Sequence, residues 1–146
     1  DIWWAVAAIF GLCALMSCGS YRPNYASATA SAISGASWGV REKLRSDNAA
    51  FFRVFPKADK EFWGPDSWLN KYNGRNPENG RNRKPIWITD GWHLLGTTSQ
   101  VTAFSSGAFI ATKKRDKRWH YLLDFGICFA SYSASNYFIH DILLKK

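Results

Sequence analysis

Long stretches of mostly apolar residues alternate with short polar breaks along this chain, and one long polar segment lies in the middle. The apolar stretches cover residues 2–18, 25–45, 86–111 and 119–144, and the polar segment covers residues 46–85. Stretches of this length with few charges are typical of helices that cross a lipid bilayer. The pattern therefore predicts an all-α membrane protein of one domain, with three or four transmembrane helices around a central loop.

Residues 86–111 form the clearest of these stretches, because they contain no Lys or Arg and only one carboxylate. Asp90 and His93 lie three positions apart, and Thr97 and Gln100 follow at helical spacing. Burying a charged or polar side chain in lipid is costly, so we expect this polar stripe to point into the protein.

Small residues recur every fourth position in the predicted helix 25–45, at Ser27, Ser31, Gly35 and Gly39. Such a ridge lets two helix backbones approach closely within a membrane. We therefore expect these residues to form a helix-packing surface. The alternative is that the Ala- and Ser-rich run is a flexible linker.

Residues 2–18 begin with two Trp residues, as an aromatic belt at a membrane surface would place them. The stretch ends in Leu-Met-Ser-Cys-Gly, which also resembles a lipoprotein signal that carries its lipid on Cys18. We interpret it as a retained membrane helix.

The composition is basic and aromatic, with a formal net charge of +8, a pI near 9.6 and eight Trp residues. The mean hydropathy of −0.26 is low for a membrane protein, but the charges are concentrated in the central loop and in the run 113–118. A basic, aromatic loop suits either nucleic acid or anionic lipid head groups. Because apolar helices flank this loop, we expect head groups as its partner and not nucleic acid.

Two tryptophan-rich motifs stand in the middle of the chain. The runs FWGP at 62–65 and SWLNKY at 67–72 come first, and TDGWH at 89–93 follows them. In this order they resemble a group of small integral membrane proteins of bacteria and their phages. The resemblance covers about residues 35–100 and implies a membrane location, which for a bacterial protein would be the inner membrane.

The resemblance also marks Asp90 and His93 as features of the group. Members often carry an acid and then a His on the helix before the loop. Glu42 matches the acid, but no His follows it on that helix, which argues against a metal site shared with the group. The resemblance implies no activity.

Ionisable groups inside membrane helices are costly, and they commonly mark functional sites. The predicted polar intramembrane site consists of Asp90, His93, Glu42, Asp124 and His140. Imidazole and carboxylate groups suit Zn or Fe, so Asp90, His93 and His140 are the candidate metal ligands. The alternative is structural, with Asp90 pairing with His93 or capping a helix.

Other catalytic patterns are weak, so no catalytic residue is assigned. His120 and Asp124 have the spacing of a lipid-phosphatase motif, but the Pro-Ser-Gly-His element of that family is missing. Cys13, Cys18 and Cys128 lie in apolar runs without paired spacing, which predicts buried thiols and not a thiolate zinc site.

We therefore expect a non-enzymatic, multi-pass membrane component, such as a subunit or scaffold of a larger membrane assembly. Its expected partners are membrane lipids and other membrane protein subunits. The alternative is a membrane-embedded enzyme with a His and carboxylate metal site. The sequence indicates no particular cofactor.

Overall fold

The computed structural model describes residues 21–145, and three long helices build this part of the chain. They are α2 (Tyr25–Ser46), α5 (Gly91–Thr112) and α6 (Arg118–Tyr137). No strand occurs within these residues, so the all-α prediction is confirmed. The predicted helix 2–18 lies outside the described residues, and the segment 25–45 is a helix and not a linker.

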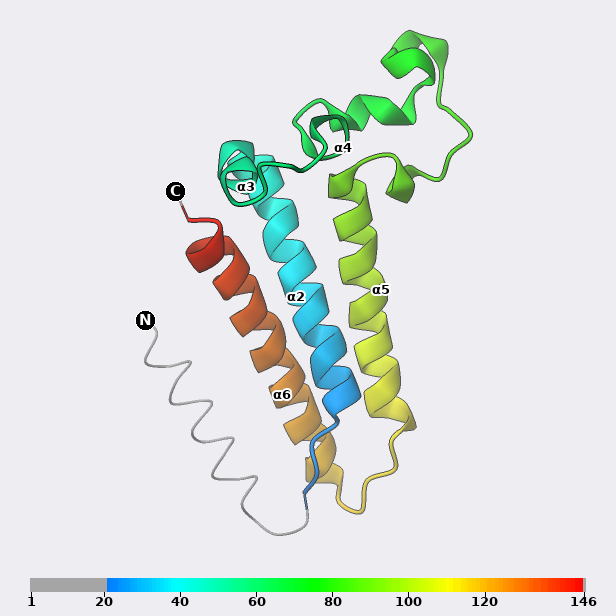
Figure 1. Ribbon diagram of the computed structural model, residues 1–146. Helices are drawn as coiled ribbons and strands as arrows, with labels where there is room; N and C mark the ends of the chain where they lie inside the picture. Colours follow the sequence, from blue (N-terminus) through cyan, green and yellow to red (C-terminus); the bar gives the residue numbers. More distant parts are fainter. Residues whose placement is uncertain (1–20, 146) are drawn as a thin grey trace.

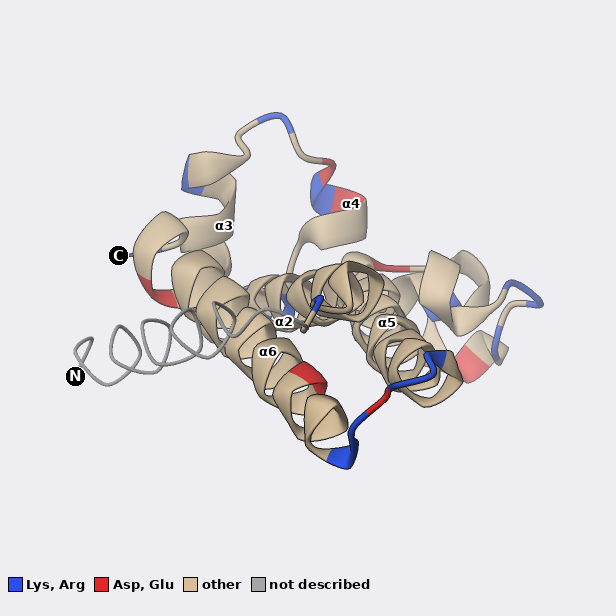
Figure 2. Cartoon of the chain, turned by 90° about the horizontal axis from the view of Figure 1, so that it is seen from below, with Lys and Arg blue, Asp and Glu red and all other residues tan. Residues whose placement is uncertain are grey.

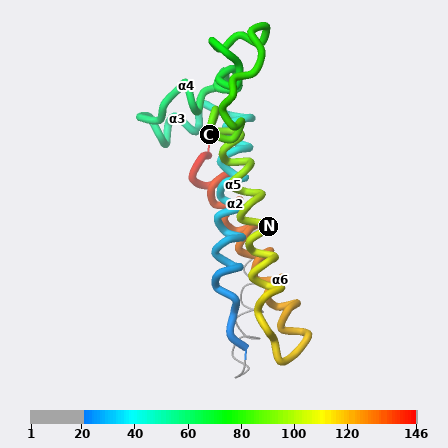
Figure 3. The backbone as a smooth tube through the Cα atoms, turned by 90° about the vertical axis from the view of Figure 1, so that its right-hand side faces the viewer, coloured from blue at the N-terminus to red at the C-terminus, as the bar shows by residue number. Residues whose placement is uncertain are grey.

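Helix α2 lies between the other two (Figure 1), and it packs against both along much of its length, whereas α5 and α6 scarcely meet. Seen from the side, the three helices overlap and form a single layer (Figure 3). The layer leaves both of its broad faces without a covering helix among the described residues. Side chains that α5 and α6 direct away from α2 therefore lie at the surface.

Short helices fill the predicted central loop and stand at one end of the layer (Figure 1). Two are α-helical, α3 (Asn48–Val54) and α4 (Lys60–Trp63). The others are four 3-10 turns, namely Ser67–Lys71, Asn73–Arg75, Pro77–Asn79 and Ile86–Ile88. We call residues 47–90 the cap.

Polar side chains set the starts of α2 and α5. The Asn24 side chain accepts a hydrogen bond from the backbone N–H of Ser27, and Asp90 accepts one from that of His93. These are N-caps, which satisfy backbone donors that have no partner within the helix. Helix α5 therefore begins at Gly91 and not at Ile86, because Asp90 lies outside it as its cap.

The last helix also differs from the predicted range 119–144. Regular α-helix extends from Arg118 to Tyr137, and a π-helical turn then covers Phe138–Leu143. Between residues 21 and 145 no helix combines the length with the apolar character that a membrane crossing requires.

Serine hydroxyls fill the contact between α2 and α5. The Ser31 and Ser106 hydroxyls lie 2.7 Å apart, and the Ser34 hydroxyl donates to the backbone carbonyl of Ser99 at 2.8 Å. All four side chains are buried. Each polar group has a partner across the helix pair, so its burial is compensated.

Glycines bring α2 against α6. A Cβ atom added at Gly35 would overlap the backbone carbonyl of Tyr132, and one added at Gly39 would lie 3.0 Å from the carbonyl of Asn136. The predicted ridge therefore serves two neighbours, because Ser31 faces α5 while Gly35 and Gly39 face α6. Ser27 is buried at the start of α2, where its hydroxyl donates to the Asn24 carbonyl.

The predicted polar stripe on α5 is wrong at its far end. Gln100 is exposed, and the face of α5 towards α2 carries Ser99 and Ser106 instead. Because Asp90 is the N-cap of α5 and its backbone is not helical, counting helical steps from it gives the wrong face of the helix.

Candidate functional site

The two tryptophan-rich motifs meet at a pocket between the cap and the first turn of α5. The pocket has a volume of about 310 Å³ and takes most of its walls from the runs 62–65, 67–72 and 89–93. It is lined by Leu44, Arg45, Trp63, Gly64, Pro65, Ser67, Trp68, Asp90, Trp92 and His93. Segments more than twenty residues apart in sequence thus build one concave site.

Asn70 holds the two motifs together. Its side-chain amide donates to the backbone carbonyl of Glu61 at 2.7 Å and to that of Thr89 at 3.0 Å. One amide group thereby links α4 to Thr89, the residue before the N-cap of α5. The Asn82 side chain donates in turn to the Asn70 carbonyl, which anchors the 3-10 turn Ser67–Lys71 that contains Asn70.

A glycine permits the close approach of cap and helix. Any Cβ atom at Gly91 would overlap the six-membered ring of Trp63. The Trp63 ring therefore lies directly on the first turn of α5, and it forms one wall of the pocket. Phe51 and Phe62 pack against its other sides, with ring centroids 5.4 and 5.0 Å away.

Asp90 and His93 form a hydrogen-bonded pair in this pocket. Asp90 is 0% exposed, and its Oδ2 lies 2.7 Å from Nδ1 of His93. A carboxylate only accepts hydrogen bonds, so Nδ1 carries the hydrogen and Nε2 is the ring nitrogen left for a ligand. The pair resembles the base and its orienting acid in hydrolytic enzymes, although a nucleophile at hydrogen-bond distance is not seen among the described residues.

Arg41 and Arg45 bring positive charge to the same end of α2. The Arg41 guanidinium stacks between two indoles, 3.8 Å from the ring centre of Trp92 and 4.6 Å from that of Trp38. Glu42 lies 3.7 Å from Arg41 and 4.0 Å from Arg45. Arg41 is thus enclosed by its stacking partners, whereas Arg45 remains largely exposed at the pocket mouth.

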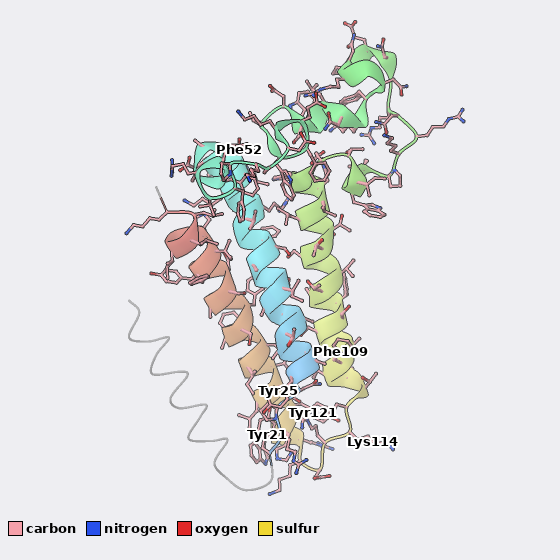
Figure 4. All side chains as sticks on the ribbon, viewed as in Figure 1. Tyr21, Tyr25, Phe52, Phe109, Lys114 and Tyr121 are labelled. Atoms are coloured by element: carbon pink, nitrogen blue, oxygen red, sulfur yellow. The ribbon has the colours of Figure 1, made fainter. Side chains whose placement is uncertain are left out.

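A second polar cluster lies at the opposite end of the layer, near the labels of Tyr21 and Lys114 in Figure 4. Asp124 is buried there and accepts hydrogen bonds from the Tyr21 hydroxyl at 2.6 Å and from the Asn24 backbone at 3.2 Å. The Arg115 guanidinium completes the cluster, with Nε 2.8 Å from Asp124 Oδ2. Three chain segments are joined by this one carboxylate.

The cluster alters the chemistry of Tyr21. Burial, together with the hydrogen bond to Asp124 and the negative charge of that carboxylate, raises the pKa of the phenol well above its ordinary value. Sequence reasoning missed both Tyr21 and Arg115. Arg115 stands in a run of basic residues where nothing distinguishes it from its neighbours.

His140 and Glu42 lie in a third place. They line a shallow pocket between α2 and the end of α6, and Nδ1 of His140 lies 3.0 Å from Oδ1 of Asp141. Because α2 separates this pocket from α5, His140 does not join Asp90 and His93. Within residues 21–145 no three His, Cys, Asp or Glu side chains are grouped as a metal site would need.

The five residues predicted as one polar site therefore fall into three locations: Asp90 with His93, Asp124 with Arg115, and Glu42 with His140. Cys128 is a buried thiol, as predicted, and accepts a hydrogen bond from Ser106 at 3.4 Å. Comparisons of the chain with protein-family models, with curated proteins and with solved structures found no match.

Proposed function

We propose that this chain is an integral membrane component without catalytic activity, which serves as a subunit or scaffold of a larger membrane assembly. The observation that carries the proposal is the inverted distribution of side chains in the helical layer. Small polar groups fill the helix contacts, and large apolar groups cover the outside. In water, exposing these apolar side chains would be unfavourable. In lipid, their contact with the surrounding acyl chains is favourable.

The outward side chains are large and contiguous along the helices. Phe104 of α5 is 82% exposed, and Leu122 and Phe129 of α6 are 73% and 74% exposed. Phe125, Val101 and Phe109 are exposed on the same two helices. Apolar surface of this extent marks a contact with lipid or with another protein.

The hydroxyl groups of α5 do not oppose this proposal. Thr98, Thr102 and Ser105 each donate to the backbone carbonyl four residues earlier, at 2.9, 2.8 and 2.9 Å. A hydroxyl bonded in this way presents little unsatisfied polarity to its surroundings. Many Ser and Thr residues lower the hydropathy of the helix, yet their polar atoms are already paired.

The charges fall at the ends of the layer and in the cap (Figure 2). Helix α5 contains no Lys, Arg, Asp or Glu, and α2 has none before Arg41. The basic side chains of the cap and of the 113–118 turn suit anionic head groups on the two sides of a bilayer. Partners of this kind, lipids and further membrane subunits, are part of the proposal, as is a location in a bacterial inner membrane.

The alternative, a metal-dependent membrane enzyme, has less support. The Asp90 and His93 pair offers two ligands, and His140 lies elsewhere. A catalytic metal commonly takes three protein ligands and keeps one open position. The scaffold proposal needs no such group.

Membrane extraction of a matched pair of variants tests the proposal. Phe104→Glu places a carboxylate on the outer face of α5, and Phe55→Glu makes the same change in the cap, where Phe55 is also exposed. A charge in mid-helix costs about 2.5–3.5 kcal/mol on insertion scales. Wild type and Phe55→Glu should therefore stay with the membranes after alkaline carbonate washing, and Phe104→Glu should be depleted from them.

The opposite result would overturn the proposal. A protein that dissolves in water gains solubility when an exposed Phe becomes Glu. Wild type released as a monomer by carbonate, together with better solubility of Phe104→Glu, would show that the helices do not reside in lipid.

A further inference from the structure

The wall of the pocket between the cap and the first turn of α5 is mainly apolar, and most of its polar side chains are hydrogen-bond donors. Trp63, Trp68 and Trp92 each bring an indole N–H, which can only donate, and Arg45 brings a guanidinium. The one carboxylate in the wall, Asp90, is already engaged by His93 and Thr89. A ligand that fits this pocket must therefore supply the acceptors.

Arg45 and His93 are the two side chains of this wall that can bind an anionic group. The Arg45 side chain is 72% exposed, and its ion-pair contact among residues 21–145 is Glu42, at 4.0 Å. His93 keeps Nδ1 on Asp90, so Nε2 is the ring nitrogen that can meet a ligand. A guanidinium and an imidazole on the wall of one pocket can together bind an oxyanion.

The aromatic walls disfavour a cationic ligand. Two of the three indoles in the wall already have a cation of the chain over the ring, Arg41 over Trp92 at 3.8 Å and Lys71 over Trp68 at 5.5 Å. A third positive charge among these groups would be repelled. The walls are instead suited to the carbon skeleton of a small anion.

We propose that this pocket binds a phosphate ester through Arg45 and His93, with Asp90 as the residue that orients the imidazole. The volume of about 310 Å³ is at the small end of ligand sites, which span about 300–1,000 Å³. It suits a head group and not a whole lipid. A phosphate has acceptor oxygens on all sides, and it can meet donors from α2, from α5 and from the cap together.

The phosphate ester has two possible sources, a free metabolite or the head group of a membrane lipid. Only the lipid source rests on the membrane proposal above. The pocket lies at the end of the layer where the helices pass into the polar cap, which is where lipid phosphates would lie if the layer spans a bilayer.

Nitrogen NMR of the histidine rings tests the binding directly. The full chain, labelled at its three His residues and held in neutral detergent, is titrated with glycerol 3-phosphate, with glycerate and with glycerol. The His93 signals, identified by their loss in His93→Gln, should shift with glycerol 3-phosphate and stay unmoved with glycerol. Glycerate should bind at least tenfold more weakly, because it lacks the additional phosphate oxygens.

Two variants that each remove one positive charge distinguish binding at a specific site from general electrostatic attraction of an anion to a basic protein. Arg45→Gln removes the proposed anion ligand, and Lys57→Gln removes an exposed cap charge that lines none of the pockets described. Arg45→Gln should weaken glycerol 3-phosphate binding about tenfold, the effect of losing one charge-assisted hydrogen bond. Lys57→Gln should leave it unchanged.

A last arm identifies the source. Phosphatidylglycerol added to the detergent should shift the same His93 signals at lower mole fraction if the ligand is a lipid, and tighter binding of glycerol 3-phosphate would indicate a free ester. No shift with either phosphate ligand, or an equal loss in both charge variants, would overturn the proposal. Because the detergent sample needs no bilayer, this outcome is independent of the carbonate extraction.

Discussion

At the scale of single residues, two glycines of α5 that look alike in the sequence have opposite surroundings. Gly91 lies under the Trp63 ring, where an added methyl group has no room, whereas Gly107 has nothing within 4 Å. Glycine in a helix is about 0.5–1 kcal/mol less favourable than alanine, so each position must be judged by what surrounds it.

Gly91→Ala should lower the free energy of unfolding by about 1–3 kcal/mol, because overpacking forces Trp63 away from α5. Gly107→Ala, as the control, should be neutral or raise it by up to about 1 kcal/mol. Thermal unfolding in the same detergent measures both. Equal shifts of the two variants would show that Trp63 does not rest on Gly91.

At the scale of elements, the layer depends on how closely α2 approaches α6. Gly35 lies against the backbone of Tyr132, so no side chain separates the two helices there. Close backbone approach strengthens dispersion contacts, which are individually weak and collectively large. Between α2 and α5 the contact is made by hydrogen-bonded hydroxyl groups, such as those of Ser31 and Ser106.

Gly35→Ala should therefore destabilise the layer by about 1–3 kcal/mol, and Gly35→Leu should do so more strongly. Gly126→Ala is the matched control on the facing helix, because nothing lies within 4 Å of that position. Chemical unfolding followed by tryptophan fluorescence measures the difference. If Gly35→Ala and Gly126→Ala behave alike, α2 and α6 do not pack as described.

At the scale of the whole molecule, one buried carboxylate joins segments that lie about a hundred residues apart. Asp124 of α6 binds Tyr21 and Asn24 before α2, and also Arg115 in the turn after α5. The Arg115 side chain is 6% exposed, so its charge is compensated within the protein. Removing one member leaves the remaining buried groups with one hydrogen bond fewer, which is costly.

Tyr21→Phe should lower stability by about 1.5–3 kcal/mol at neutral pH, because a hydrogen bond to a charged acceptor is lost. It should also flatten the dependence on alkaline pH. The pKa of Tyr21 is raised in the folded protein, so its stabilisation is complete below the unfolded value of about 10 and is lost as the pH rises above it.

Unfolding temperatures measured from neutral to strongly alkaline pH test the predicted loss of stability with rising pH. Wild type should lose stability more steeply than Tyr21→Phe at the alkaline end. Tyr25→Phe is the control, since Tyr25 is largely exposed. Parallel curves for all three proteins would exclude a buried, neutral Tyr21 phenol.

Local sequence signals predicted the helical elements because they act within a few residues. Long, mostly apolar runs predicted the three described helices. Asn24 and Asp90 have the short polar side chains that cap a helix start. The structural alternative for Asp90, as cap and His93 partner, was visible from spacing alone. The small-residue ridge likewise indicated helix contact.

Only the tertiary structure decided which of these elements face each other. The position of α2 between α5 and α6 separates His140 from His93 and leaves Gln100 exposed, although the sequence places all three on predicted helices. The same packing brings Trp63 onto Gly91 and Arg115 onto Asp124. Periodicity tells which side chains share a face of one helix, but not the partner of that face, because the partner depends on contacts far apart in the chain.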